Sequence, residues 1–260
     1  MNISVITVPG SSYAKYLLNH AKRIDLPIQT VVVVHYGLVR SLKIVHSMFV
    51  RRLGWWDTFF FLANRVLQER QQGVVQEWRG SPVIHDYESL AHNVMHTSDL
   101  NDPLFLQQFS ASKPDLMILA QTGLVKKPLL QIPGIGTLNA HTAWLPEYRG
   151  NHVLYWTLYF QQFHRIGYTI HYVDEGMDTG DIIRFTASPP RPGESYDVLQ
   201  ARLMEEAAIG LAETAKECLV QPPKGEPQRA EAGRKYFAMP HALRKNALNN
   251  LHRYYRSLEQ

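Results

Sequence analysis

Short apolar runs alternate with amphipathic stretches in the N-terminal half of the chain. Residues 3–8, 31–34 and 116–120 are rich in Val, Ile and Leu, which is typical of strands buried on both faces of a sheet. Residues 13–24 carry apolar side chains at helical spacing. Strands alternating with helices predict an α/β, Rossmann-like fold, in which a mostly parallel sheet is flanked by helices, with a small C-terminal extension.

Further elements are expected along the rest of the main domain. They are a strand that begins at residues 83–84, strands at residues 136–139 and 168–173, and helices at residues 99–109, 154–163 and 196–219. Ser98 or Asp99 would cap the first of these helices, and Asp197 suits the positive end of the last. Loops that follow parallel strands should meet at one edge of the sheet.

Residues 40–72 carry apolar side chains at helical spacing with arginines between them. A basic, aromatic helix of this kind suits a membrane surface or a partner protein, whereas a helical pair packed on the sheet is the commoner arrangement. We interpret the stretch as a helical pair and leave its purpose open.

The C-terminal region has a different pattern from the main domain. Residues 221–227 read Gln-Pro-Pro-Lys-Gly-Glu-Pro, which is typical of a linker, and residues 242–258 form an amphipathic helix. We therefore expect two parts, a main domain at residues 1–220 and a linker with a C-terminal extension at residues 221–260. The apolar face of the last helix should dock on its own main domain or on a second subunit of a homodimer.

Composition narrows the class of protein. The 260 residues are 45% hydrophobic, which is enough for one sizeable core, and the single cysteine, Cys218, excludes a disulfide framework and a Cys-based zinc site. Twelve histidines are present, but none has metal-ligand spacing beside an acidic residue, so we expect no metal. The chain starts without a basic leader and has no uninterrupted apolar run of about eighteen residues, which favours a cytoplasmic protein without a membrane span.

The charge balance is basic but modest. A formal net charge of +4 and a pI near 9.1 are spread over several segments, so nucleic acid is not expected as a partner. A small anionic substrate explains the balance equally well.

Three polar residues follow predicted strands and form a candidate catalytic set. Asn139 and His141 come at the end of one strand, and Asp178 lies in the loop after another. An amide can donate to an oxygen that gains charge, an imidazole can move a proton, and a carboxylate can hold the imidazole. The same Asn-x-His spacing recurs at Asn250 and His252 in a helical context, so the spacing carries weight only at the strand end.

The sequences NAHTAWLPEYRG and GYTIHYVDEGMDTGDII surround these residues, and KPDLMILAQTGLVKKPLLQIPGIGTLNAH precedes them. This segment resembles the catalytic core of the folate-dependent formyltransferases, which include glycinamide ribonucleotide transformylase, methionyl-tRNA formyltransferase and the sugar N-formyltransferases. The resemblance is close over residues 99–190 and loose over residues 1–35. It implies acyl transfer, with Asn139, His141 and Asp178 as the catalytic residues of a catalytic domain at residues 1–220.

The resemblance also implies 10-formyltetrahydrofolate as the formyl donor. The family's pterin-binding loop would fall on Gly123, Leu124 and Val125, which follow the strand at residues 116–120, although a plain turn is the alternative. The acidic loop after the strand at residues 168–173 is included among the cofactor contacts. Its residues are Asp174, Glu175 and Gly176.

The acceptor is expected to be a primary amine of a small molecule. Candidate contacts are Tyr148, Arg149 and His171, together with the phosphate-binding turn Gly10, Ser11 and Ser12, for which a plain strand-to-helix turn is equally acceptable. Arg149 could equally be a surface residue, and His171 and Thr169 could equally be half-buried strand residues.

The C-terminal extension bears on the choice of amine. The pair Tyr236 and Phe237 resembles the extension of sugar N-formyltransferases, and about forty residues after the catalytic domain are too few for the family's tRNA-binding domain. We therefore expect a nucleotide-linked amino sugar. Alternatives are glycinamide ribonucleotide, a hydroxyornithine-like side chain, water as acceptor in a formyltetrahydrofolate hydrolase, and a binding module without activity.

Overall fold

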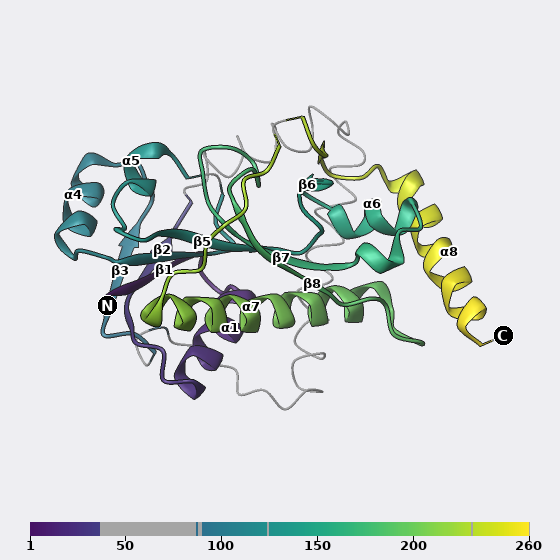
Figure 1. Ribbon diagram of the computed structural model, residues 1–260, viewed down its shortest axis with the longest axis horizontal. Helices are drawn as coiled ribbons and strands as arrows, with labels where there is room; N and C mark the ends of the chain where they lie inside the picture. Colours follow the sequence, from purple (N-terminus) through teal and green to yellow (C-terminus); the bar gives the residue numbers. More distant parts are fainter. Residues whose placement is uncertain (37–86, 88–89, 124, 230, 260) are drawn as a thin grey trace.

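A seven-stranded sheet forms the centre of the computed structural model, which describes residues 1–36, 87, 90–123, 125–229 and 231–259 (Figure 1). The strand order is β3-β2-β1-β4-β5-β7-β8; the first five strands run parallel, and β7 and β8 are antiparallel to their neighbours. The strands are β1 (Ile3–Thr7), β2 (Ile28–Val34), β3 (Asn93–Thr97), β4 (Leu116–Ala120), β5 (Gly136–His141), β7 (Gly167–Tyr172) and β8 (Ile182–Ala187). The predicted α/β fold with a mostly parallel sheet is confirmed.

Helices cover both faces of this sheet. The helices α1 (Ser12–Arg23) and α7 (Tyr196–Val220) pack on one face, and α4 (Pro103–Ala111) and the short α5 (Lys127–Leu130) lie on the other (Figure 1). Every residue of β1 and of β4 is buried, as their continuous apolar sequences require. This two-sided core fixes the strand ends from which the candidate site is built.

The C-terminal extension packs against the same chain. The helix α8 (His241–Leu258) buries Leu251 and Tyr255 against α6 (Val153–Tyr159), at the right of Figure 1. Asn250, which repeats the Asn-x-His spacing, donates from Nδ2 to the main-chain oxygens of the last turn of α6. The second Asn-x-His pair therefore contributes a helix cap and packing at the docked extension.

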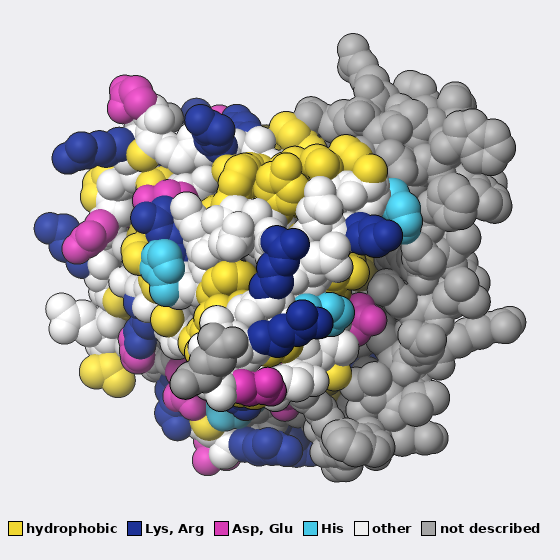
Figure 2. Space-filling model, turned by 90° about the vertical axis from the view of Figure 1, so that its right-hand side faces the viewer, with side chains coloured by type: hydrophobic (Ala, Val, Ile, Leu, Met, Phe, Trp, Pro, Cys, Tyr) yellow, Lys and Arg dark blue, Asp and Glu magenta, His cyan; other side chains and the backbone are white. Residues whose placement is uncertain are grey.

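The region predicted to be a linker is extended and hydrogen-bonded to the domain. After it, β9 (Arg234–Tyr236) pairs in parallel with β6 (Tyr148–Gly150) in a separate two-stranded sheet. Figure 2 faces the α8 end of the molecule and shows lysine and arginine side chains spread over this face instead of gathered in one patch. The lysines and arginines that make the sequence basic are therefore spread out on this face.

Several element boundaries differ from expectation. The predicted helix at residues 99–109 begins at Pro103, because Asp102 accepts a hydrogen bond from the Phe105 N–H and acts as the cap in place of Ser98 or Asp99. The helix predicted at residues 154–163 ends at Tyr159, and a separate turn of 3-10 helix, η3 (Phe163–Arg165), follows. The strands β3 and β8 were not predicted.

Two predicted segments lie outside the described residues. They are the helical pair at residues 40–72 and the strand that begins at residues 83–84. In the described part of the chain, no helix is long and apolar enough to cross a membrane.

Candidate active site

Two adjacent strands bring the candidate residues together near the carboxyl end of β5. Asn139 on β5 is paired in register with His171 on β7, so both side chains lie on the same face of the sheet. His141 lies two residues further along β5 and is only 8% exposed. The loop after β7 then returns Asp178 to this edge, so the three predicted catalytic side chains are neighbours.

Hydrogen bonds fix the state of His171. Its Nδ1 lies 2.7 Å from the Tyr172 carbonyl oxygen, which can only accept, so Nδ1 carries the hydrogen. Its Nε2 lies 3.2 Å from Asn139 Nδ2, which can only donate, so Nε2 is an acceptor. Burial is the largest influence and lowers the pKa of His171, while the nearby Asp178 carboxylate opposes it. A neutral His171 therefore orients the Asn139 amide.

The Asn139 amide keeps one hydrogen for another acceptor. Nδ2 carries two hydrogens, and the bond to His171 uses one of them. Because His171 sets which end of the amide carries nitrogen, the second N–H has a defined direction as well. An oriented donor of this kind is what a developing oxyanion requires.

His141 is held by one ring nitrogen and leaves the other for chemistry. Its Nε2–H donates to the Tyr148 carbonyl oxygen at 2.7 Å. Its Nδ1 faces Asp178 Oδ2 at 3.7 Å, which is longer than a hydrogen bond but close for an ion pair. When Nδ1 takes a proton, the opposite charge of the nearby carboxylate stabilises the imidazolium.

Asp178 adopts a backbone conformation that neighbours must hold in place. Its φ of 53° lies in the left-handed region, which is sterically disfavoured for residues other than glycine. Its Oδ2 accepts a hydrogen bond from the Gly150 N–H at 2.8 Å. Its Oδ1 lies 4.0 Å from His171 Nε2, so the carboxylate faces both histidines.

Gln228 was not identified from the sequence and contacts this loop directly. Its Nε2 donates to the main-chain oxygens of Asp178 and Gly180, and its Oε1 accepts from Arg149. Arg149 is only 5% exposed, so the interpretation of it as a surface residue is wrong. Its guanidinium bonds within the protein, and a contact with the acceptor stays a prediction. A glutamine in a Pro-rich segment carries no sequence signal for such a role.

The residues predicted to hold the donor lie on two loops. Gly123 follows β4 and its N–H lies 3.4 Å from the Tyr36 hydroxyl, whereas the side chain of Val125 is buried in the core. Leu124 lies outside the described residues. Their main-chain contacts with a pterin stay a prediction.

The second loop is organised by Asp174. Its Oδ1 accepts hydrogen bonds from the Gly176 N–H and the Thr179 hydroxyl, which shapes the turn that leads to Asp178. Asp174 and Glu175 are exposed. This loop is therefore preformed and open to a ligand, and its donor contacts remain a prediction.

In the predicted phosphate-binding turn after β1, the Ser11 hydroxyl is hydrogen-bonded within the protein. Ser11 Oγ accepts from the Ala14 N–H as the cap of α1 and donates to Gln121 Oε1 at 2.8 Å. Ser11 is 4% exposed, and Gly10 supplies the positive φ of 68° that the turn needs. The geometry matches a strand-to-helix turn, and phosphate binding by Gly10, Ser11 or Ser12 stays a prediction.

Thr169 has a structural role. Its hydroxyl donates to the Ala143 carbonyl oxygen and accepts from the Leu145 N–H, and the side chain is fully buried. It fixes the path of the chain just after His141. Of the two strand residues considered from the sequence, His171 is the one that lies at the catalytic set.

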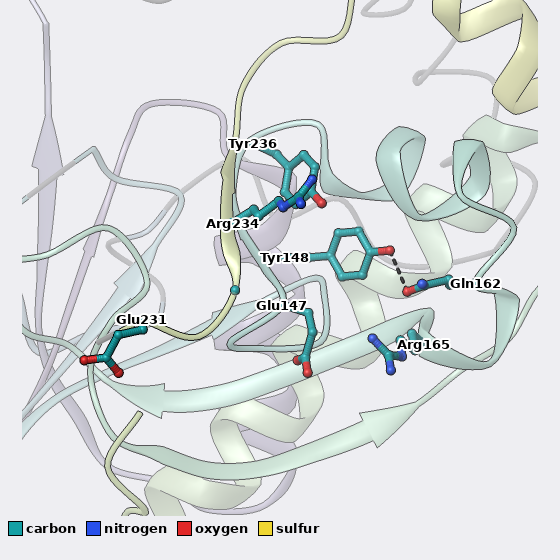
Figure 3. Close-up of a pocket in the computed structure, with 8 residues that line it drawn as sticks. Glu147, Tyr148, Gln162, Arg165, Glu231, Arg234 and Tyr236 are labelled. Atoms are coloured by element: carbon teal, nitrogen blue, oxygen red, sulfur yellow. Dashed lines mark hydrogen bonds between the residues drawn. The ribbon is translucent and has the colours of Figure 1, made fainter. Parts of the chain in front are cut away.

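A pocket of about 360 Å³ adjoins the site through Tyr148, whose carbonyl oxygen holds His141. The Tyr148 and Tyr236 rings stack at 5.2 Å, and the Tyr148 hydroxyl donates to Gln162 (Figure 3). Burial raises the pKa of Tyr148 to about 12, which keeps the phenol protonated. The lining residues are Glu147, Tyr148, Gln162, Arg165, Glu231, Gly233, Arg234 and Tyr236.

Comparison with known proteins adds the decisive observation, because residues 67–215, more than half of the chain, match the formyl transferase family. The chain belongs to the formyl transferase family. The match covers the strands from β3 to β8 and with them Asn139, His141 and Asp178. Among the residues that the structure describes, no group of three or more His, Cys, Asp or Glu side chains could hold a metal ion.

Curated relatives that this chain matches carry the name methionyl-tRNA formyltransferase. One from Syntrophus aciditrophicus is 39% identical over 111 residues, which are 42% of this chain and 35% of that protein. One from Desulfotalea psychrophila is 31% identical over 147 residues, 56% of this chain and 45% of that protein. The matched part of the chain spans less than half of the length of these relatives.

Solved structures share the fold of this chain at low identity. A sugar N-formyltransferase from a Shewanella species has a TM-score of 0.59 at 9% identity, covering 96% of this chain and 87% of that one. A phosphoribosylglycinamide formyltransferase from Anaplasma phagocytophilum has a TM-score of 0.59 at 16% identity, covering 92% of this chain and 98% of that one. Both alignments therefore cover more than nine tenths of this chain.

Proposed function

We propose that this protein transfers the formyl group of 10-formyltetrahydrofolate to a primary amine. The observation that carries the proposal is the convergence of the Asn139 amide, His141 Nδ1 and the Asp178 carboxylate at one sheet edge. Each group presents the atom that acyl transfer to an amine requires: a donor for an oxyanion, a base and a carboxylate partner for that base.

The reaction follows from these three groups. The nitrogen of the neutral amine attacks the formyl carbon, and the bond from that carbon to N10 of the folate breaks. The second N–H of Asn139 stabilises the charge on the formyl oxygen, and His141 Nδ1 takes the proton that the amine loses. Asp178 stabilises the imidazolium, which returns the proton to the departing N10. The products are a formamide and tetrahydrofolate.

For the acceptor, we favour an amino sugar linked to a nucleoside diphosphate. The pocket beside Tyr148 supports this choice, since stacked tyrosines suit a nucleobase and Arg165 and Arg234 suit phosphate oxygens (Figure 3). Among the described residues, Arg165 Nε and Glu147 Oε2 at this pocket are buried without a hydrogen-bond partner.

A second candidate acceptor is the amino group of a charged tRNA. The names of the curated relatives favour it, since they are methionyl-tRNA formyltransferases. Water as acceptor would make the protein a hydrolase with the same three residues. The three possibilities differ in what consumes the formyl group.

An acceptor screen separates them. Purified protein is incubated with saturating 10-formyltetrahydrofolate and with each acceptor, and tetrahydrofolate release is followed. We expect the nucleotide-linked amino sugar to react at least tenfold faster than the free sugar, because remote binding energy lowers the barrier at the amine. Equal rates for the two sugars, or activity with methionyl-tRNA alone, would reject the amino-sugar acceptor. Release at the same rate without any amine would reject formyl transfer itself.

A further inference from the structure

The segment at residues 221–236 connects both halves of the candidate site. It leaves α7, accepts a hydrogen bond at the Pro223 carbonyl oxygen from the Tyr172 hydroxyl, and pairs Glu226 with Ile182 at the start of β8. It then ends in β9, which pairs with β6. Figure 1 shows this yellow-green trace rising from the end of α7 toward β6 before it reaches α8. We call residues 221–236 the strap.

We propose that Gln228 of the strap is a positioning residue that sets the Asp178 carboxylate against His141. The inference rests on the proposed function, because it concerns the same reaction. Gln228 itself contacts the main chain of the Asp178 loop and the side chain of Arg149.

Both ends of the Gln228 amide are used. Nε2 donates to the main-chain carbonyl oxygens of Asp178, at 3.0 Å, and Gly180, at 2.6 Å. Oε1 accepts two hydrogen bonds from the Arg149 guanidinium, at 2.7 Å and 3.2 Å. The two carbonyls flank Thr179 in the turn where Asp178 has its left-handed backbone. A glutamine amide thus acts as a clamp on the turn that aims the carboxylate.

Arg149 ties this clamp to the other half of the site. It lies on β6 between Tyr148, whose carbonyl oxygen holds His141, and Gly150, whose N–H donates to Asp178. The buried Arg149 guanidinium therefore connects β6, which holds His141, with Gln228, which holds the Asp178 turn. The distance between His141 and Asp178 depends on Gln228 through both connections.

Steric constraints keep the strap and the loop in one arrangement. A Cβ added to Gly180 would lie 2.0 Å from the Tyr172 carbonyl oxygen, and one added to Gly225 would lie 2.5 Å from Asp181 Cβ. A Cβ at Gly233 would lie 1.6 Å from the Pro146 carbonyl oxygen, where the strap meets the β6 side. The strap is thus closely packed on Asp181 at one end and on Pro146 at the other, and it can transmit a constraint between them.

The test compares Gln228 with a glutamine of the same segment that faces solvent. Gln228→Ala should lower kcat about tenfold to a hundredfold with KM values within about threefold, because the loss falls on the transition state. Gln228→Glu keeps an acceptor for Arg149 but loses both N–H donors, so it should lower kcat by a similar factor. Gln221→Ala, at an exposed position, should keep kcat within about twofold.

The outcomes separate the inference from the proposed function. A kcat within twofold of wild type for Gln228→Ala or Gln228→Glu, or a raised KM with unchanged kcat, overturns the positioning role. Hydrogen exchange gives a readout without activity: amides at residues 174–181 should exchange faster in Gln228→Ala than in wild type or Gln221→Ala. If Gln228→Ala fails to fold, Gln228→Glu decides. If the wild-type protein transfers no formyl group, the proposed function is rejected. The hydrogen-exchange result at residues 174–181 then tests the positioning role of Gln228 without reference to activity.

Discussion

The turn after β1 and the end of β5 lie at the same edge of the sheet, and both carry polar residues. The two places differ in whether those polar groups are all bonded within the protein. After β1, Ser11 caps α1 and bonds Gln121, so its hydroxyl is already used within the fold. At the end of β5, Asn139 and His141 each make one bond that orients the side chain and leave a second atom available. Polar residues at a strand end become a site when orientation and availability are combined.

The largest effect that tests this comparison is expected at the end of β5. Asn139→Ala should lower kcat about a hundredfold to a thousandfold, as loss of one oxyanion donor does in comparable sites. His141→Asn and Asp178→Ala should each lower it more than about a hundredfold, since both act on proton transfer. Steady-state turnover measures the loss, and circular dichroism shows that the fold is kept.

The second Asn-x-His pair supplies the matched control. Asn250 caps α6 from a buried position, and His252 is exposed on α8. His252→Asn should leave kcat within about twofold. Asn250→Ala should lower the thermal midpoint, with only a small effect on kcat. Near-native turnover of His141→Asn, or an equal loss in His252→Asn, would contradict the assignment.

A third histidine sharpens the distinction between chemistry and support. His152 accepts a hydrogen bond at Nδ1 from the Met239 N–H, and burial lowers its pKa from 6.5 to about 4. The unfolded chain then takes up a proton before the folded chain does, so stability falls as the pH drops from about 6.5 to about 4. The loss from this residue is at most about 3 kcal/mol.

Replacement of this histidine checks the sign. His152→Asn keeps a residue that tolerates its left-handed φ of 57° and removes the titration. Its thermal midpoint should fall less than that of wild type between pH 6.5 and 4, with kcat at neutral pH nearly unchanged. A steeper fall in the variant would show that the sign is wrong.

The smallest effect is expected at the turn after β1. Ser11→Ala removes the cap of α1 and should lower the free energy of unfolding by about 1 kcal/mol, while kcat stays within about threefold. Ser11→Thr, which keeps a capping hydroxyl, is the control. A kcat loss above tenfold at unchanged stability would mean that this turn binds substrate after all, and the contrast between the two strand ends would fail.

The parts of the fold that could be predicted are those with a strong local pattern. The strand β4 and the helix α7 follow from their apolar sequences, with N-capping by Ser195 at the start of α7. The strand β3 has exposed and half-buried residues at the sheet edge, and β8 is likewise only partly buried, so neither has the continuous apolar run of a central strand. Their pairing depends on neighbours that a local pattern does not specify.

The candidate site divides along the same line. Asn139, His141 and Asp178 could be selected because each lies at or after the end of a predicted strand and because the surrounding motif resembles a family. His171 gains its role only when β7 pairs with β5 in the observed register. Gln228 contacts Asp178 across fifty residues of sequence, and only the folded chain brings such residues together.

The position of the strap in the chain has a consequence for biosynthesis. All seven strands of the main sheet lie before residue 190, whereas Gln228 and the β9 partner of β6 come later. During translation at about 5–20 residues per second, the sheet is available to fold seconds before the strap has left the ribosome. A nascent chain therefore has all strands of its main sheet before Gln228 is made, so we expect the Asp178 carboxylate to be aligned only in chains whose synthesis has passed Tyr236.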